Sequence, residues 1–600
     1  MVTDETPVLK FESRIAAFTQ QQIRYTRKSR TIGWLRLAIF LGGVGGCYFF
    51  FDRGQNLAGF SMLICFYIIF LIALKYHTQL QYQQKHYTFL TNINKEEVER
   101  LKGNLHVFDP GNRYQNSQHL YTSDLDIFGR HSLYQLLNRA ITGIGQDKLA
   151  AWLQAPAPFQ EISSRQEAVA TLAPAIDWRQ ELQAKALHYK HTVTQPFQFF
   201  DWLNEPTFYK DKGWLKALIF VLPPITIAGL YLLFTANWSY LALAGMISQY
   251  LLGYKYSLER DTYYEKSSGM YEVLQSYRDI LKHIENYPTK AAKIQKLQQQ
   301  LQVDGQPASR HIHSLTQIVE YLSARMNVYV SLILNTVLMW DFFWMWRLDQ
   351  WKARVSGNMQ AILEVVAETE ALASLAAFKY ANPSFTVPQI SSTPFEFVAQ
   401  QLGHPLIFSS NLIKNNFRMA GKGHTGIITG SNMSGKSTFL RTVGINLVLA
   451  QAGAVVCADN FLFYPMQVYT AMRTEDNLAE STSSFYAELK RLRMLLDLTI
   501  TDTPVFYLLD EILKGTNSGD RHAGAKALIL QLHKRNASGL VSTHDLELGA
   551  LEQEHPDFIQ NYSFNSIIEG DKIIFDYKLH PGICKSFNAS KLMQLMGIEM

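Results

Sequence analysis

The segment from Thr429 to Gly444 reads TGSNMSGKSTFLRTVG, and its residue types and spacing are typical of a loop that binds a nucleoside triphosphate. A short apolar stretch, Gly426–Ile428, precedes the loop, and a run with helical spacing follows it. In such a strand–turn–helix context, backbone N–H groups surround the phosphates. Lys436 is then expected to reach the β and γ oxygens, and Ser437 to offer its hydroxyl to Mg²⁺. The residues predicted to bind ATP are Gly430, Ser431, Asn432, Met433, Ser434, Gly435, Lys436, Ser437 and Thr438.

Two later apolar strands end in residues that could complete a hydrolytic site. PVFYLLDE ends in Asp510, which is expected to hold Mg²⁺, and Glu511, which is expected to orient or deprotonate the attacking water. GLVSTHD leads to His544, which could sense the γ-phosphate. An Asp–Glu pair can also be an ordinary strand end, and a lone histidine after a strand is more often structural. The upstream loop favours the catalytic interpretation for Lys436, Glu511 and His544.

Length and composition limit the architecture. A chain of 600 residues is too long for one hydrophobic core, which stops growing near ~250–300 residues, so several domains are expected. The net charge of +5 is small for this length and does not by itself indicate a nucleic-acid patch. The four cysteines form no CxxC pair, which fits a reducing compartment and predicts no metal other than Mg²⁺.

Four apolar runs come in two closely spaced pairs. The first pair is Leu37–Phe51 and Leu57–Leu74, and the second is Ala217–Ala236 and Trp238–Tyr254. Most of these runs approach or reach the ~17–25 residues that cross a bilayer, so two transmembrane helical hairpins are predicted. The alternative is that these helices are buried in a large soluble core.

Basic residues predict the orientation of the two hairpins. The turns that connect the paired runs carry only Arg53, whereas the outer flanks are rich in lysine and arginine. These flanking residues are Arg27, Lys28, Arg30, Arg36, Lys75, Lys85, Lys210, Lys212, Lys216 and Lys255. Because basic residues favour the cytoplasmic side, we expect a multi-pass plasma-membrane protein whose large domains are cytoplasmic.

A fifth apolar run, Met326–Trp351, is interrupted by Asn335, Asp341 and Arg347. A charge in the middle of a bilayer costs at least ~2.5 kcal/mol, so this run is expected to be a long buried helix of a soluble domain.

The chain is thus predicted to be a multi-domain protein. A basic segment with a hairpin at about 35–75 occupies 1–120, and a helical region interrupted by the hairpin at about 215–256 occupies 121–385. An α/β domain with the phosphate loop is expected at 386–600, where the pattern changes to short β-rich runs with glycine.

These motifs resemble the ATPase domain of the MutS family of DNA mismatch repair proteins. The phosphate loop, LLDEILKGTNSGD and VSTHDLEL match the family's pattern, and Phe128–Pro156 looks like the start of its helical core and lever domain. The resemblance implies a P-loop ATPase of the ABC type that uses ATP and Mg²⁺. GHPLI and NNF are similar to segments near the adenine, which places Asn415 there. ESTSSFYAELKRL is similar to the family's signature, which implies that Ser483 and Ser484 approach the nucleotide of a partner subunit in a homodimer.

The chain departs from the family pattern in three places. The family's N-terminal domains carry a mismatch-reading Phe-x-Glu, and residues 1–120 contain no such triplet. The second hairpin stands where the family often inserts a DNA-gripping clamp. The sequence ends at Met600 without the family's C-terminal dimerising helices.

The leading hypothesis is a membrane-anchored, MutS-like ATPase that binds DNA, in mismatch repair or related DNA processing, with an ATP-driven change in dimer conformation. The alternatives are an ATP-dependent membrane scaffold and a transporter-like ATPase, both without DNA binding. Membrane runs without charged residues make a poor transport path.

Overall fold

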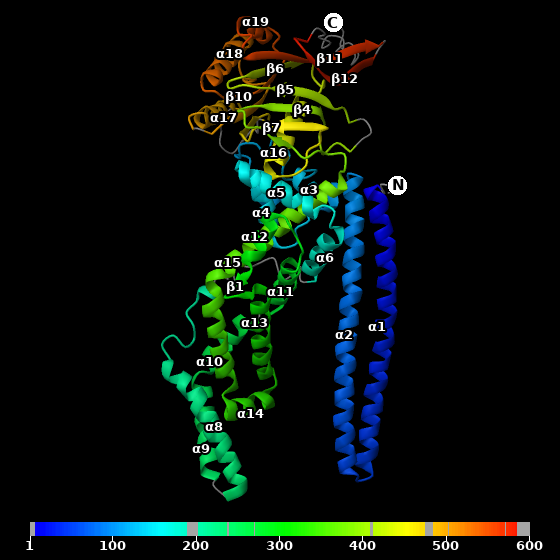
Figure 1. Cartoon of the computed structure of the whole chain (residues 1–600), viewed down its shortest axis with the longest axis vertical. Helices are drawn as coiled ribbons and strands as arrows, with labels where there is room; N and C mark the ends of the chain where they lie inside the picture. The colour runs from blue at the N-terminus through cyan, green and yellow to red at the C-terminus, as the bar shows by residue number, and fades with distance from the viewer. Residues whose placement is uncertain are drawn as a thin grey trace.

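The computed structural model describes residues 6–188, 202–236, 239–268, 271–408, 412–473, 484–501, 503–569 and 572–584. Figure 1 shows a helical region that makes up most of the length of the molecule and an α/β domain at one end. The expectation of a multi-domain chain, helical first and α/β at the C-terminal end, is confirmed.

Two long helices form the first part of the chain. Helices α1 (Pro7–Asp52) and α2 (Asn56–Leu101) have 46 residues each and pack against each other as an antiparallel pair. Aromatic side chains fill the contact between their apolar halves, where Phe40 lies 6.3 Å from both Phe66 and Phe70 between ring centroids. Both helices extend well beyond the membrane hairpin expected at about 35–75. Residues 7–34 of α1 and 76–101 of α2 therefore lie outside the predicted membrane segment.

The middle of the chain is an assembly of helices around one long element. Helix α15 (Trp340–Ala381) has 42 residues and packs against several neighbours on its buried side. The other helices of this region are α3 (Leu133–Leu137), α4 (Gly143–Gln154), α5 (Phe159–Leu172), α6 (Ile176–Leu187), α8 (Gly213–Ala236), α9 (Ser239–Lys255), α10 (Ser257–Ser268), α11 (Tyr271–Glu285), α12 (Ala292–Gln300), α13 (Ala308–Leu322) and α14 (Val328–Leu338). A small hairpin joins α12 to α13 through β1 (Gln302–Val303) and β2 (Gln306–Pro307).

A buried carboxylate fixes α15 to the first helices of this region. Glu370 of α15 accepts hydrogen bonds from the backbone N–H groups of Ile141 and Thr142 and from the Thr142 hydroxyl. Thr142 in turn caps α4, because its hydroxyl accepts the N–H of Gly145. Burial raises the pKa of Glu370 to about 7.

Helices α8 and α9 form a second antiparallel pair with close backbone contact. A Cβ on Gly229 would lie 2.5 Å from the backbone nitrogen of Ala242, so only glycine allows this approach. Inside the pair, the Gln249 amide donates to the Thr226 hydroxyl at 2.7 Å, and both residues are buried. Many outward-facing apolar side chains of the pair are exposed, as Ile227 and Leu243 illustrate.

Among the described residues, three helices are long and apolar enough to cross a bilayer by length and composition. They are α1, α2 and the Gly213–Leu233 part of α8, and the bent pair α14–α15 would make a fourth. The tips of the α1–α2 and α8–α9 pairs lie at the end of the molecule opposite the α/β domain (Figure 1). Whether the pairs span a membrane stays a prediction.

The prediction of one long buried helix at Met326–Trp351 is wrong for the first half of this run. The chain breaks at Met339, whose φ of 49° is left-handed, and α14 meets α15 at an angle of 78°. Asn335 stabilises the break because its side-chain oxygen accepts the N–H of Asp341 in the first turn of α15. No residue of α14 is buried, whereas much of α15 is.

The α/β domain contains two sheets. The larger has the order β12-β11-β6-β10-β9-β8, and all its neighbours are parallel except β11 and β12. Its strands are β6 (Thr425–Gly430), β8 (Gln467–Ala471), β9 (Val505–Asp510), β10 (Ser538–Thr543), β11 (Ile559–Glu569) and β12 (Lys572–Pro581). The smaller sheet, in the order β3-β7-β4-β5, contains β3 (Gln389–Ile390), β4 (Phe397–Leu402), β5 (Asn415–Met419) and β7 (Asn460–Phe463). The helices are α16 (Lys436–Ala452), α17 (Ser484–Leu498), α18 (Ser518–Lys534) and α19 (Leu551–Glu554).

The carboxylate of Asp124 is one of the contacts that join the helical region to the α/β domain. Asp124 is fully buried and accepts the Thr470 hydroxyl at 2.7 Å, the backbone N–H groups of Met472 and Arg473 at 3.2 and 3.1 Å, and Arg491 at 3.3 Å. These contacts come from the end of β8 and from α17. The carboxylate therefore connects three segments that are far apart in the sequence.

We expect Asp124→Asn to destabilise the protein by about 1–3 kcal/mol, because the amide cannot accept all of these buried donors. Asp126→Asn is the matched control, since Asp126 is partly exposed and bonds Arg473 at the rim. Its loss should cost no more than about 1 kcal/mol. Thermal unfolding of the purified full chain measures both variants, and equal stability losses would contradict the role given to Asp124.

Candidate functional site

The predicted catalytic residues lie at the carboxyl ends of three adjacent parallel strands. β6 leads to Lys436 through its glycine loop, β9 ends at Asp510 and Glu511, and β10 leads to His544. β10 lies between the other two, with Thr543 paired to Thr429 and Ser542 paired to Asp510. Carboxyl ends of parallel strands are where α/β sheets bind their ligands.

The loop between β6 and α16 has the backbone that its sequence predicts. Gly435 adopts a φ of 104° as the residue before α16, a conformation that favours glycine, and the φ of Met433 is 66°. Lys436 folds back over the loop and donates to the carbonyl oxygens of Gly430 and Ser431, both at 2.9 Å. The side chain thus lies over the loop at the N-terminus of a 17-residue helix, where anions are favoured.

Glu511 and His544 form an ion pair beside the loop. His544 Nε2 lies 2.5 Å from Glu511 Oε1 and 3.5 Å from Lys436 Nζ. The other Glu511 oxygen lies 3.0 Å from Lys514 Nζ, a contact that the sequence analysis missed. The structure therefore brings together the three residues predicted to be catalytic.

The electrostatics of this group follow from its contacts. The hydrogen bond from His544, with help from Lys514, lowers the pKa of Glu511 to about 2, so this carboxylate is ionised at neutral pH. Burial lowers the pKa of Lys436 from its ordinary value, while Glu511 and Asp510 oppose that shift. Glu511 also has a left-handed φ of 49°, and such strained positions are frequent at functional sites.

Several buried polar atoms around the loop have no hydrogen-bond partner. They are the hydroxyls of Ser431, Ser434 and Ser542 and the Oδ1 atom of Asp510. Unpaired buried polar atoms are costly, so their concentration here fits a site that is completed by a polar ligand. A carboxylate oxygen such as Asp510 Oδ1 and a serine hydroxyl such as that of Ser437, the second residue of α16, are ligands that suit Mg²⁺.

A largely apolar cavity of about 260 Å³ opens beside the glycine loop. Asn415 lies in its wall, with its amide donating to the Tyr577 carbonyl at 3.1 Å and its oxygen accepting the Leu579 N–H at 2.9 Å. His404 also lines the cavity, and burial lowers its pKa to about 4, which keeps the ring neutral. The sequence analysis missed Tyr577, which reaches the cavity from β12.

The signature residues lie only partly within the structure. Ser483 lies outside the described residues, and Ser484 begins α17. Further along α17, the buried Glu488 accepts the backbone N–H of Leu513, in the turn that follows Glu511. The signature helix is therefore bonded to the loop that carries Glu511, a link with no signal in the sequence.

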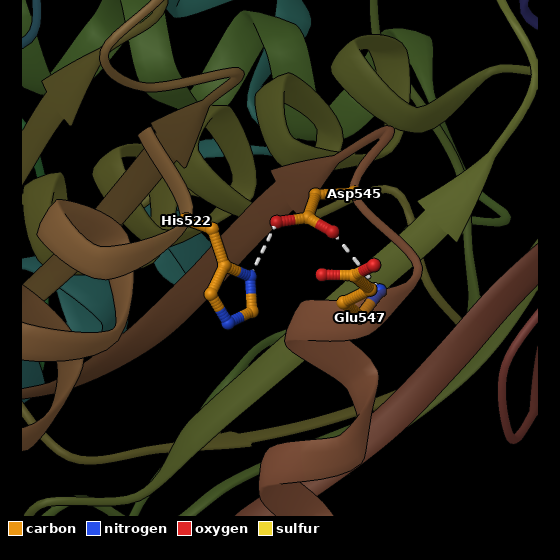
Figure 2. Close-up of side chains that lie close together, drawn as sticks. All are labelled: His522, Asp545 and Glu547. Atoms are coloured by element: carbon orange, nitrogen blue, oxygen red, sulfur yellow. Dashed lines mark hydrogen bonds and ion pairs between the residues drawn. The ribbon is translucent and has the colours of Figure 1, made fainter. Parts of the chain in front are cut away.

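A second polar group lies next to His544. His522 Nδ1 lies 2.7 Å from Asp545 Oδ2, and Asp545 Oδ1 accepts the backbone N–H of Glu547 (Figure 2). These three side chains are close enough to hold a metal ion. Because both Asp545 oxygens already bond within the group, we interpret it as a support that holds the segment after β10 against α18.

This fold and site define an α/β domain with a ligand site at the carboxyl ends of a mainly parallel sheet. Residues 426–598 match the family model described as MutS domain V. A DNA mismatch repair protein MutS from Thermotoga maritima is 31% identical over 252 residues, which are 41% of this chain and 31% of that protein. The corresponding protein from Lactobacillus helveticus is 30% identical over 302 residues, 48% of this chain and 34% of its own length. The DNA mismatch repair protein MutS 2 of Halobacterium salinarum is 30% identical over 250 residues, 41% of this chain and 28% of that protein.

The C-terminal part of the chain thus matches MutS domain V and is similar to MutS proteins. The matched region spans about a third of the length of these relatives.

We expect Asn415→Ala to lower the free energy of unfolding by about 1–3 kcal/mol, because it leaves the Leu579 N–H and the Tyr577 carbonyl without their partner. Arg418→Ala is the control, since its side chain is exposed on the other face of β5. That substitution should change stability by no more than about 0.5 kcal/mol. Denaturant unfolding measures the free energy of unfolding of the two variants. A larger loss of stability in the control than in Asn415→Ala would refute the bridging role of Asn415.

Proposed function

We propose that this protein is a MutS-type ATPase, anchored in a membrane, that acts on DNA in mismatch repair or a related process. The observation that carries the ATPase part is the convergence of Lys436, Asp510, Glu511 and His544 at the ends of β6, β9 and β10. The unpaired polar atoms around the loop support the same assignment.

Each residue has a defined role in this proposal. Bound ATP with Mg²⁺ would supply the phosphoryl group that is transferred to water. Lys436 would leave the loop carbonyls and neutralise phosphate charge, while Ser437 and Asp510 would hold Mg²⁺. Glu511, ionised because of its low pKa, would orient the water and accept its proton, and His544 would hold Glu511 in place.

The cavity beside the loop suits a nucleobase. Its wall combines the apolar side chains of Phe439 and Ile413 with the ring of Tyr577, the neutral His404 and the Asn415 bridge. Apolar and aromatic walls with few polar groups are typical of such pockets. Because Gly435 also lines the cavity, a base bound there would lie next to the loop that would hold the phosphates.

We expect Lys436→Ala to weaken ATP binding, whereas Glu511→Gln should retain binding and slow turnover by a factor on the order of 10² or more. Lys422→Ala is the control, because Lys422 is exposed before the opposite end of β6. Binding of a fluorescent ATP analogue and steady-state phosphate release measure the two properties. Equal loss of binding in both site variants would rule out these roles.

A homodimer is part of the proposal. By resemblance, Ser483 and Ser484 of one subunit would approach the nucleotide of the other. The bond between Glu488 of α17 and the Leu513 N–H supports a coupling between this segment and Glu511 of the same subunit. Contact with a second subunit would then affect the position of the catalytic carboxylate.

Two helix pairs would hold the protein in the plasma membrane, with its large domains in the cytoplasm. The α1–α2 and α8–α9 pairs project in the same direction (Figure 1), and their exposed side chains are largely apolar. In α8–α9 the polar pair Gln249–Thr226 faces inward, the arrangement that lipid-exposed helices adopt. The basic residues that flank both pairs support the orientation.

Action on DNA is proposed by similarity to the relatives, which are DNA mismatch repair proteins. Residues 1–120 contain no Phe-x-Glu that could read a mismatch, and the α8–α9 pair stands where the family often has its clamp. Affinity should therefore come from phosphate contacts, which do not depend on sequence.

We expect binding to duplex DNA to fall by about tenfold or more between 50 and 200 mM salt, because phosphate contacts release counterions. Matched, mismatched and branched duplexes should bind the detergent-solubilised full chain alike, with ADP and with a non-hydrolysable ATP analogue. A mismatch preference above about tenfold, or ~1.4 kcal/mol, would contradict the absence of a mismatch reader. No binding in any nucleotide state would refute the DNA part of the proposal and leave the ATPase part standing.

A further inference from the structure

We propose that α14 is a third membrane contact of this protein, lying along the cytoplasmic face of the bilayer with its exposed side chains among the lipid acyl chains. The inference rests on the proposed membrane anchoring by α8 and α9. It assigns a lipid surface, rather than a protein core, to a segment that neither its position in the chain nor the MutS match explains.

The chemistry of α14 fits lipid better than water. No charged residue occurs in Met326–Trp340, and the side chains of Val328, Tyr329, Leu332 and Ile333 are between 51% and 81% exposed. An exposed apolar surface of this kind on a helix usually marks a contact with a partner or a membrane. The helix has 11 residues, about 16 Å at 1.5 Å per residue, which is too short to cross a core of ~30 Å.

The position of α14 supports an in-plane orientation. The helix packs against α9 and α8, the two helices of the proposed second anchor. It runs at 78° to α15 and lies across the long direction of the molecule, on the side from which α8–α9 projects (Figure 1). A bilayer that surrounds the α8–α9 pair would therefore meet the side of α14.

Charged and aromatic side chains mark the boundary above α14. Arg260 lies 3.0 Å from the buried carboxylate of Asp341, and Arg325 pairs with Asp261. Ionic pairs thus close both ends of the uncharged segment and hold them to α10.

Next to these pairs, the Tyr321 ring stacks on Trp344 at 4.4 Å, and the Trp340 indole N–H donates to the Tyr321 carbonyl. Tryptophan and tyrosine gather at the level of lipid headgroups. Ionic pairs and a tyrosine–tryptophan cluster thus lie together next to both ends of the apolar helix, as expected of a segment at a membrane interface.

Lipid contact of α14 can be tested with a fluorescent label in proteoliposomes. Cys47 and Cys65, the two native thiols that are not buried, are first changed to serine. Single cysteines are then introduced by Ile333→Cys on α14, Ile227→Cys on α8 and Ile500→Cys in the α/β domain, all at exposed positions. Each is labelled with an environment-sensitive dye in the full chain and compared in ordinary lipids and in lipids brominated on the acyl chains.

We expect the label at 333 to emit at shorter wavelength than the label at 500 and to lose fluorescence in brominated lipid to the same order as the label at 227. The label at 500 should not respond. Quenching at 227 without quenching at 333 would overturn the inference and leave the anchoring intact. A blue-shifted but unquenched label at 333 would show that protein, such as a second copy of the chain, covers α14, which also overturns it. Absence of quenching at both 227 and 333 would refute the anchoring itself and the inference with it.

Discussion

The buried carboxylate of Asp124 helps to fix the position of the helical region relative to the α/β domain. It accepts hydrogen bonds from Met472 and Arg473 at the end of β8 and from Arg491 of α17, so it fixes the chain before and after Ser483 and Ser484. The same short stretch of chain continues into α3 and α4, which Glu370 bonds to α15. A displacement of α17 is therefore resisted by the helical region, and a displacement of α15 is resisted by the α/β domain. Because the carboxylates of Asp124 and Glu370 are both buried, water cannot replace their hydrogen bonds at low cost.

The geometry of the candidate site depends on this connection. Glu511 sits in a strained backbone conformation, with His544 on one side and the turn bonded to Glu488 of α17 on the other. The sheet alone would place the Glu511 carboxylate near the glycine loop, since β10 lies between β9 and β6. The α17 contact adds a dependence on the helix whose first residue is Ser484. In the proposed dimer, the state of one subunit's signature would thus reach the water-activating carboxylate through the bonds of Glu488 to the turn after Glu511.

Much of this was predictable from the sequence, and the exceptions have physical causes. The strands before Lys436, Asp510 and His544 were predicted because apolar runs bounded by glycine or charge are strong local signals. Their order in the sheet was not, because pairing between distant strands leaves no local trace, and Tyr577 was missed for the same reason: β12 folds back beside β11 and β5. The long apolar run after Met326 misled the prediction, since periodicity cannot distinguish a helix buried in protein from one exposed on its surface. The break at Met339 depends on the contact of Asn335 with the next helix, which only the folded chain supplies.

The parallel projection of the α1–α2 and α8–α9 pairs limits the symmetry of the proposed dimer. Two subunits anchored in one bilayer must both point their hairpin tips to the same side. A two-fold axis parallel to the membrane plane would turn one copy upside down, so the only allowed two-fold axis runs along the membrane normal. In the proposed anchored dimer, both α/β domains would then stand at equal height, separated from the bilayer by the 42-residue α15, which is about 60 Å long at 1.5 Å per residue. Two anchored subunits would then meet by diffusion within the membrane plane. Only their rotation about the membrane normal would have to be correct for the dimer to form.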